Sequence, residues 1–460
     1  GLTTVRFVGG VSPGAPCRPT LELKLAMTDY SITTGRRLRE TARDEREQQQ
    51  VELLRQHVAH ARTSPFYRER LAGLVITPAA IRTLADLPCL PLTAREDLDL
   101  HGNRLWAVSP DKVADLALTS GTTGPPVQVP YTAGDLERLA YNEAMSFYGT
   151  GTRAGDRCLI CVTLDRCFIA GLAYYQGIVR LGATAIRSGS GQPARQWDLI
   201  TMLRPTVLVG VPTFLLQIAQ WAKARDFRPE EAGIQRLVII GEPVRRPDMS
   251  LTPLGEELTR TWASPVCASY GATELETGIC ECTIGRGGHL HPELCLAEII
   301  DEQGNPLADG LPGELVLTPL GVRGFPLIRF RTGDIARKYS EPCACGWQTE
   351  RIGPIEGRVA QRLKMKGTTL YPEAVFQILQ EVPGVQASYL EVRASYDLSD
   401  SVRVVVGGNG PLDPREIETL LQARLRVRPE VLVQDIGLVT ATMTGGGERK
   451  SKRFFDFRNR

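Results

Sequence analysis

The chain has 460 residues, 42% of them hydrophobic, and its 54 Lys and Arg residues nearly balance its 52 Asp and Glu residues. The net charge of +2 creates no field that would attract nucleic acid or a lipid surface, so we expect neither as a partner. The longest apolar stretch, residues 207–222, is broken by Gly210 and Pro212, which argues against a membrane span. This length and composition predict a globular protein with more than one domain.

Residues 1–36 begin with Gly1 and open without a signal-peptide core or helical periodicity, so we expect a tail or a remnant of cloning there. The eleven cysteines, without a secretory signal, favour a reducing compartment, and we expect a cytoplasmic protein. Residues 37–72 are charged, rich in Leu and Gln, and carry apolar positions at helical spacing until Pro65 interrupts them. They predict an N-terminal helical region.

The stretch LTSGTTGPPV, residues 118–127, concentrates glycine and hydroxyl side chains between apolar flanks. Glycine at 121 and 124 lets the backbone turn successive N–H groups toward one point, which suits an oxyanion such as phosphate. An ordinary surface turn is the alternative for such a composition. A P-loop of the Walker A kind is disfavoured, because Pro125 and Pro126 stand where Lys and Ser or Thr would be needed.

Beyond this loop, helical and strand-like segments alternate. Short apolar runs rich in β-branched residues lie within residues 156–164, 183–188, 206–212, 236–243 and 265–274, and most of them end in Gly or Pro. Such runs are typical of buried parallel strands whose loops carry the functional site. After Glu276 the strands shorten and turn signals separate them, which indicates an antiparallel β subdomain.

From residue 357 strand and helix patterns return in a segment of about 100 residues, the size of a small domain. The sequence therefore predicts an α/β protein with two domains. The large N-terminal domain would span residues 37–357 and contain a layered α/β part and the β subdomain. A small, mobile α+β domain would span residues 358–460.

Three motifs place groups suited to a nucleotide on turns. SYGATE, residues 269–274, offers the aromatic ring of Tyr270, the hydroxyl of Thr273 and the carboxylate of Glu274. Asp334 follows a Thr-Gly turn in RFRTGDI, and Arg358 opens the small domain. Each motif alone is more often an ordinary turn, but their joint order and spacing indicate one site.

A metal site is predicted from four cysteine and histidine positions. Cys282 and His289 lie in CTIGRGGH, and the sequence CACG supplies Cys343 and Cys345. Three thiolates and one imidazole form the ligand set of a closed, tetrahedral structural zinc site. Reduced cysteines also occur as plain core residues, and Cys280 and His291 are rival ligands.

Together these stretches resemble the adenylate-forming superfamily of acyl-CoA synthetases, adenylation domains and luciferases, and within it the phenylacetate-CoA ligase-like branch. The resemblance covers nearly the whole chain after about residue 37. It is carried by the sequences TSPFYRERLAG, LADLPCLPLTAREDL, LTSGTTGPP, GVPTFLLQIA, IIGEP, YGATE, LIRFRTGD, GRVAQRLKMKGTTLYPEAV and GERKSKRFFDFR. Some members of this branch carry a zinc site of the kind described above.

The resemblance implies a role for each motif in binding ATP. The loop would bind the β- and γ-phosphates through Thr119, Ser120, Gly121, Thr122, Thr123 and Gly124. Gly241, Glu242 and Pro243 would line the adenine site, and Tyr270, followed by Gly271, would stack on the base. Thr273 would contact the α-phosphate, Glu274 would hold Mg²⁺, Asp334 would accept from the ribose hydroxyls, and Arg358 would steady the nucleotide from the domain junction.

Lys450, in GGGERKSKRFFDF, matches the catalytic lysine of the family. Its ammonium group would bridge the substrate carboxylate and the α-phosphate. A solvated basic tail is the alternative, because Arg449, Lys452 and Arg453 surround it.

The implied function is an ATP- and Mg²⁺-dependent ligase that forms an acyl adenylate, preferably of an aromatic acid, and passes the acyl group to coenzyme A. Other fates of the adenylate stay open, namely transfer to a carrier-protein thiol or to an amine. The activated oxyanion could also be nitrite in place of a carboxylate, toward a diazo product. A degenerate nucleotide-binding module is the third interpretation. A homodimer is possible.

The acid should bind between residues 162–177, 210–214 and 269–274. Phe168, Tyr174, Phe214 and Gly241 are predicted to form a flat apolar slot for an aromatic acid, although they could equally be core residues. Arg166 stands where the branch generally carries less charge, so it is a candidate for recognising a polar or anionic group.

Two positions depart from the family pattern. Pro125 replaces the lysine of the usual T-T-G-K-P loop, which removes a charge that would face the polyphosphate. Ala360 stands where the hinge between the domains usually has an acidic residue. The sequence therefore supports adenylation more strongly than the thioester step, which depends on reorientation of the small domain.

Overall fold

The structure is a computed structural model that describes residues 30–74, 77–119, 126–365, 368–394, 400–445 and 451–458. Its centre is a nine-stranded sheet with the strand order β13-β14-β9-β8-β7-β6-β5-β3-β4. Five strands run parallel: β3 (Arg157–Ile160), β4 (Thr184–Arg187), β5 (Val207–Gly210), β6 (Arg236–Ile240) and β7 (Val266–Ala272). The antiparallel edge is built from β8 (Thr277–Glu281), β9 (Gly288–His289), β14 (Arg351–Ile352) and β13 (Lys338–Tyr339).

Helices cover both faces of this sheet, which explains why its central strands are apolar throughout. In β5, Val207 and Val209 pack into one hydrophobic cluster and Leu208 into another, so alternate side chains enter opposite layers. The helices are α5 (Ala133–Gly149), α6 (Ile169–Leu181), α7 (Pro193–Leu203), α8 (Pro212–Lys223) and α9 (Pro253–Trp262). The predicted α/β class is therefore confirmed.

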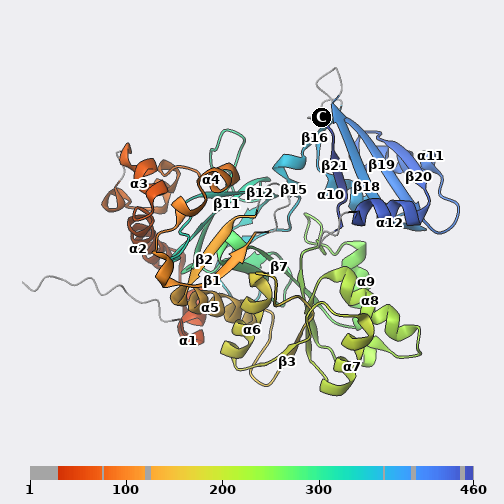
Figure 1. The fold of residues 1–460 in the computed structure, drawn as a ribbon, viewed down its shortest axis with the longest axis horizontal. Helices are drawn as coiled ribbons and strands as arrows, with labels where there is room; N and C mark the ends of the chain where they lie inside the picture. Colours follow the sequence, from red (N-terminus) through yellow and green to blue (C-terminus); the bar gives the residue numbers. More distant parts are fainter. Residues whose placement is uncertain are drawn as a thin grey trace, which may run out of the picture.

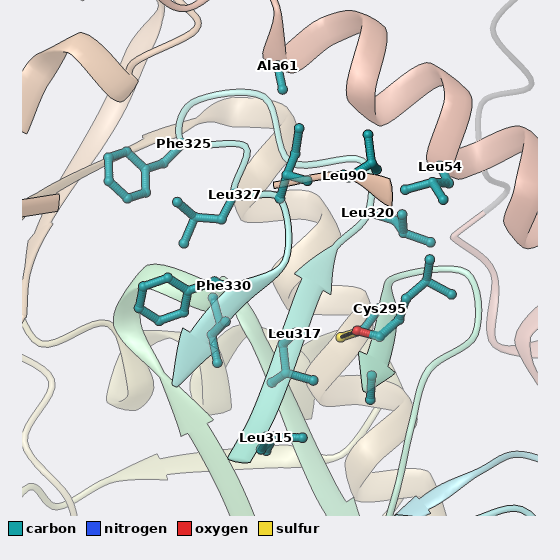
Figure 2. Packing of buried hydrophobic residues seen from close by; sticks show 14 of the residues in the cluster. Leu54, Ala61, Leu90, Cys295, Leu315, Leu317, Leu320, Phe325, Leu327 and Phe330 are labelled. Atoms are coloured by element: carbon teal, nitrogen blue, oxygen red, sulfur yellow. Dashed lines mark hydrogen bonds between the residues drawn. The ribbon is translucent and has the colours of Figure 1, made fainter. Parts of the chain in front are cut away.

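A second, four-stranded antiparallel sheet contains β10 (Cys295–Ile300), β11 (Gly313–Pro319), β12 (Phe330–Ala336) and β15 (Gly357–Arg358). Helices α2 (Arg43–Ala61), α3 (Pro65–Ala72) and α4 (Arg95–His101) accompany it, together with the hairpin of β1 (Val113–Leu118) and β2 (Gln128–Thr132). Figure 2 shows the shared core, in which Leu54 of α2 lies beside Leu320 while Leu315 and Leu317 project from β11.

The first helix begins earlier than expected. Helix α1 (Ile32–Glu40) starts at Ser31, whose hydroxyl accepts a hydrogen bond from the backbone N–H of Thr34. A methyl group at Gly35 would collide with the hydroxyl of Tyr141, so this turn packs directly on α5. Residues 32–36, predicted to belong to a tail, are thus a packed helical turn, because tertiary contacts supply the stability that their sequence periodicity does not show.

The C-terminal part contains a separate four-stranded sheet with the order β20-β19-β18-β21 and a two-stranded sheet of β16 and β17. Its elements are the hairpin of β16 (Leu363–Met365) and β17 (Thr368–Leu370), then α10 (Pro372–Leu379), β18 (Val385–Ala394), β19 (Asp400–Gly408), α11 (Pro414–Leu425), β20 (Glu430–Gln434), α12 (Ile436–Thr444) and β21 (Phe454–Asp456). In Figure 1 these blue elements gather on one side of the molecule, with β15 and β16 leading to them. They have their own hydrophobic core, which includes Phe376, Leu390 and Leu421. None of the described helices in the whole chain combines the length and apolar character that a bilayer crossing requires.

Candidate functional site

The turns that follow β5, β6 and β7 meet at one edge of the central sheet, because these strands are parallel. After β6, Gly241 adopts a φ of 88°, a left-handed conformation that glycine adopts without strain. Glu242 then accepts hydrogen bonds from the backbone N–H and the hydroxyl of Thr213 at 3.0 and 2.9 Å. The carboxylate of the GEP motif therefore caps helix α8 and fixes this turn to the neighbouring one.

Asp334 connects the two sheets at this edge. Its Oδ2 accepts a hydrogen bond from the hydroxyl of Tyr270 at 2.9 Å, and its Oδ1 lies 3.3 Å from Nε of Arg358. Strand pairing of β12 with β15 sets Asp334 directly opposite Arg358. Burial raises the pKa of Asp334, and Arg358 acts in the opposite direction. The structure thus brings together three predicted nucleotide-binding residues that lie far apart in the sequence.

Glu274 lies in the short 3₁₀ turn Thr273–Leu275 that follows β7. Burial raises the pKa of its carboxyl, while nearby Arg95 lowers it. Arg95 lies with Nη1 3.6 Å from Glu274 Oε1 and donates from Nη2 to the hydroxyl of Thr119 at 3.2 Å. A carboxylate oxygen is the kind of ligand that Mg²⁺ prefers, and Arg95 is the cation beside Glu274 in this structure.

Thr119 and Val127 close the base of the glycine-rich loop. The backbone N–H of Thr119 donates to the carbonyl of Val127 at 3.1 Å, and the backbone N–H of Val127 donates to the Thr119 hydroxyl at 2.9 Å. Arg95 reaches this base from helix α4 and thereby links it to Glu274. Sequence reasoning missed Arg95, because a charged residue at the start of a short helix has no signal that distinguishes it from an ordinary surface residue.

Several predicted residues lie outside the described part of the chain. These are Ser120, Gly121, Thr122, Thr123, Gly124 and Pro125 of the loop, and Lys450. Their roles stay predictions. Ala360, the departure at the hinge, lies in a 3₁₀ turn (Val359–Gln361) directly after β15.

The residues predicted to form an acid-binding slot come from separate elements, and Gly241 follows β6. Tyr174 is buried in the hydrophobic cluster on one face of the central sheet, in edge-to-face contact with Phe147. Phe214 packs against the cluster on the other face, and Phe168 precedes helix α6. The side chain of Arg166 is 78% exposed and lies 4.0 Å from Asp165. Tyr174 and Phe214 thus belong to clusters on opposite faces of the central sheet, and the acid-binding slot stays a prediction.

Cys282, His289, Cys343 and Cys345 converge, with all four ligand atoms within 4.8 Å of one another. The Sγ atoms of Cys282 and Cys343 are 3.7 Å apart, and Cys345 Sγ lies 3.5 Å from His289 Nε2. A zinc ion with Zn–S bonds of about 2.3 Å in tetrahedral geometry places two sulfurs about 3.8 Å apart. The hydroxyl of Thr349, 2.8 Å from His289 Nδ1, fixes the ring with Nε2 toward the sulfurs.

The two rival ligands lie elsewhere. His291 is held by Arg39 at Nδ1 and by the hydroxyl of Ser146, 3.0 Å from Nε2. Cys280 is buried in the hydrophobic cluster beside Tyr174. Neither belongs to the group of four donors.

Comparisons with known proteins identify the family of the chain. A model of the AMP-binding enzyme family matches residues 27–322. A phenylacetate-coenzyme A ligase of Thermus thermophilus is 32% identical over 375 residues, which cover 80% of each chain. The corresponding ligase of Escherichia coli K12 is 28% identical over 433 residues, covering 90% of this chain and 96% of the relative.

Solved structures share the fold. The structure of 2-hydroxyisobutyryl-CoA ligase in its postadenylation state, in complex with 2-HIB-AMP, superposes with a TM-score of 0.81 at 20% identity and covers 92% of both chains. The same ligase in its thioesterification state gives a TM-score of 0.67 over 92% of both chains.

Proposed function

Because the chain belongs to the AMP-binding enzyme family, we propose that it is an ATP- and Mg²⁺-dependent ligase that activates an aromatic carboxylic acid as its acyl adenylate and transfers the acyl group to coenzyme A. The relatives named phenylacetate-coenzyme A ligase, matched over most of their length, support the aromatic acid and the thiol acceptor. The observation that carries the proposal is the convergence of Tyr270, Asp334 and Arg358 at the sheet edge that also holds Glu274.

This cluster is suited to the nucleoside of ATP. Ribose hydroxyls are donors, and the Asp334 carboxylate is an acceptor whose orientation Tyr270 and Arg358 fix from two sides. The ring of Tyr270 packs against the hydrophobic core, which leaves it little freedom and prepares it to receive a base. Arg358 would remain near the nucleotide through its pairing with Asp334.

In the first half-reaction, a carboxylate oxygen of the acid attacks the α-phosphorus of ATP. The new P–O bond replaces the bond to the bridging oxygen of pyrophosphate, which leaves with the electron pair. Negative charge grows on the phosphoryl oxygens, so catalysis depends on positioning and on nearby positive groups. Glu274 would hold Mg²⁺, which offsets the phosphate charge when bound.

Two basic residues would assist this step. Lys450 would place its ammonium between the acid and the α-phosphate, as the family resemblance implies. Arg95 lies where it reaches both the Glu274 carboxylate and the base of the phosphate loop, so it supplies positive charge close to the loop that lacks the usual lysine. In the second half-reaction, the thiol sulfur of coenzyme A attacks the acyl carbon and AMP leaves.

The experiment is a product analysis with ATP, Mg²⁺, coenzyme A and a panel of aromatic and aliphatic acids. We expect AMP and an acyl-CoA thioester in equal amounts with at least one aromatic acid, measured by mass spectrometry. AMP formation without a thioester would refute coenzyme A as acceptor. Parallel reactions with amines as acceptors, and with nitrite in place of the carboxylic acid, would then identify the acceptor or the activated oxyanion. Absence of acid-dependent AMP with every acid and with nitrite would contradict the ligase itself.

We further propose that Cys282, His289, Cys343 and Cys345 bind a structural Zn²⁺. Their mutual distances suit tetrahedral coordination, and the four donors leave no open position for chemistry. The ion would join the loop at Cys343 and Cys345 to strands β8 and β9 of the central sheet. Elemental analysis should find one zinc per chain, the variant Cys343→Ser should lose it, and Cys280→Ser should retain it. A full zinc content in Cys343→Ser would refute this ligand set.

A further inference from the structure

A buried carboxyl group lies beneath the strand pair that carries the YGATE turn. Glu143, on the buried face of helix α5, is 5% exposed. A methyl group at Gly278 of β8 would collide with Glu143 Oε1, and one at Gly177 of α6 would collide with its Cβ. Glu143 therefore lies where α5, α6 and β8 meet, and the two glycines provide the room for it.

This carboxyl group is poorly satisfied. Asn142 donates from Nδ2 to Glu143 Oε1 at 3.2 Å, and within the described ranges it is the only hydrogen-bond donor to the group. The ion pairs of the described residues include none with Glu143, and Oδ1 of Asn142 is itself buried without a partner. Burial raises the pKa of Glu143 to about 7. Burying a polar group without enough hydrogen-bond partners destabilises the folded protein, and a ligand that supplies the missing donor removes this cost.

The carboxyl group lies on the same face of the strand pair as Gly271 of the YGATE turn. Gly278 is paired directly with Gly271, so both face the same side of the strand pair. A methyl group at Gly271 would meet only backbone of the paired strand, Thr277 O at 3.3 Å and Gly278 Cα at 3.5 Å. Gly271 is itself exposed, and it lies three residues before Glu274.

The side chains packed on this face of the sheet near Glu143 are mostly apolar. Tyr174, which forms a hydrogen bond with Ser269, and Phe147 pack with Cys280 on the same face of the sheet. An aromatic ring fits apolar walls of this kind, and a hydroxyl or amino substituent on the ring would meet the one carboxyl group there.

We propose that Glu143 is a specificity-determining residue that accepts a hydrogen bond from an amino or hydroxyl substituent of the aromatic acid. This inference rests on the proposed function and names its substrate class. A site built around a buried acceptor disfavours an analogue that lacks the donor, because the acceptor then stays unpaired.

The test compares matched acids in wild-type protein and two variants. The pairs are 4-hydroxyphenylacetate with phenylacetate, and 3-aminobenzoate with benzoate. The readout is kcat/KM for acid-dependent pyrophosphate release, with the KM for ATP measured alongside. Glu143→Leu removes the acceptor, Glu143→Gln keeps a neutral one, and Glu137→Leu, at an exposed position of the same helix, is the control.

We expect wild-type protein to prefer the donor-bearing acid of at least one pair by tenfold or more. Glu143→Leu should reduce that ratio at least tenfold and Glu143→Gln at least threefold, with the KM for ATP within twofold and the control unchanged. If Glu143→Leu fails to fold, the ratio in Glu143→Gln decides. An unchanged ratio, or a preference of wild-type protein for both parent acids, would overturn the inference and leave the ligase intact. Absence of pyrophosphate release with any acid would instead overturn the proposed function and this inference with it.

Discussion

Replacing Asp334 with asparagine tests the nucleotide cluster most sharply. The substitution keeps the size of the side chain but removes the charge that Tyr270 and Arg358 now face. A hydrogen bond to a charged group contributes about 1.5–3 kcal/mol, so losing the charge-assisted bond to a ribose hydroxyl corresponds to about 10- to 150-fold weaker ATP binding. Because this contact is made before and during the reaction alike, kcat at saturating ATP should change by less than about threefold.

The assay is calorimetric titration with a non-hydrolysable ATP analogue, followed by initial rates over a range of ATP concentrations. Tyr270→Phe is the matched control, since it keeps the ring and removes only the hydroxyl that donates to Asp334. Its dissociation constant should rise less than that of Asp334→Asn. If Asp334→Asn keeps a wild-type dissociation constant while its melting temperature is unchanged, the ribose contact is wrong.

Three further predictions concern charge. Arg39→Met should lower the free energy of unfolding by about 3–5 kcal/mol in chemical denaturation, because it leaves the buried carboxylate of Glu293, 2.9 Å from Arg39, without its cation. The control Arg37→Met, at an exposed position, should have little effect. Equal losses of stability in the two variants would contradict this prediction. The pKa of Glu143, raised to about 7 from 4.5, means that the folded protein keeps this proton to higher pH than the unfolded chain, so stability falls as pH rises through this window. Glu143→Gln should therefore gain up to about 3 kcal/mol on wild-type protein between pH 5 and 8, and parallel melting curves would refute the burial argument. Arg95→Met should reduce kcat for adenylation at least tenfold in pyrophosphate-release assays, whereas a loss confined to thermal stability would make Arg95 purely structural.

The sequence predicted the layered fold because its signals are local. Buried strands such as VLVG and RLVII are continuous apolar runs, and turns such as Gly241 and Gly333 require positive φ, so both can be read without knowing the partner strands. The α/β fold class could be predicted for the same reason. The first helical region was expected from residue 37, but helix α1 begins at Ile32. Its stability comes from contacts of Gly35 and Arg39 with residues far away in the sequence.

The composition of the site is only partly encoded in local patterns. Asp334 and Tyr270 could be named from motifs, but their contact depends on how two sheets meet. Arg95 and Glu143 gave no signal, because an arginine on a short helix and a glutamate in a helical run are ordinary until packing places one beside Glu274 and buries the other under Gly278. The slot expected from Tyr174 and Phe214 stays a prediction, because spacing along the chain does not reveal on which face of a sheet a side chain lies.

The most direct test of the adenylation chemistry is acid-dependent exchange of labelled pyrophosphate into ATP, with Lys450→Ala as the comparison. We predict that exchange requires both Mg²⁺ and an aromatic acid, and that Lys450→Ala loses it at least 100-fold while binding ATP with unchanged affinity. Exchange at the wild-type rate in Lys450→Ala, or no exchange in wild-type protein with any acid or with nitrite, would contradict the account.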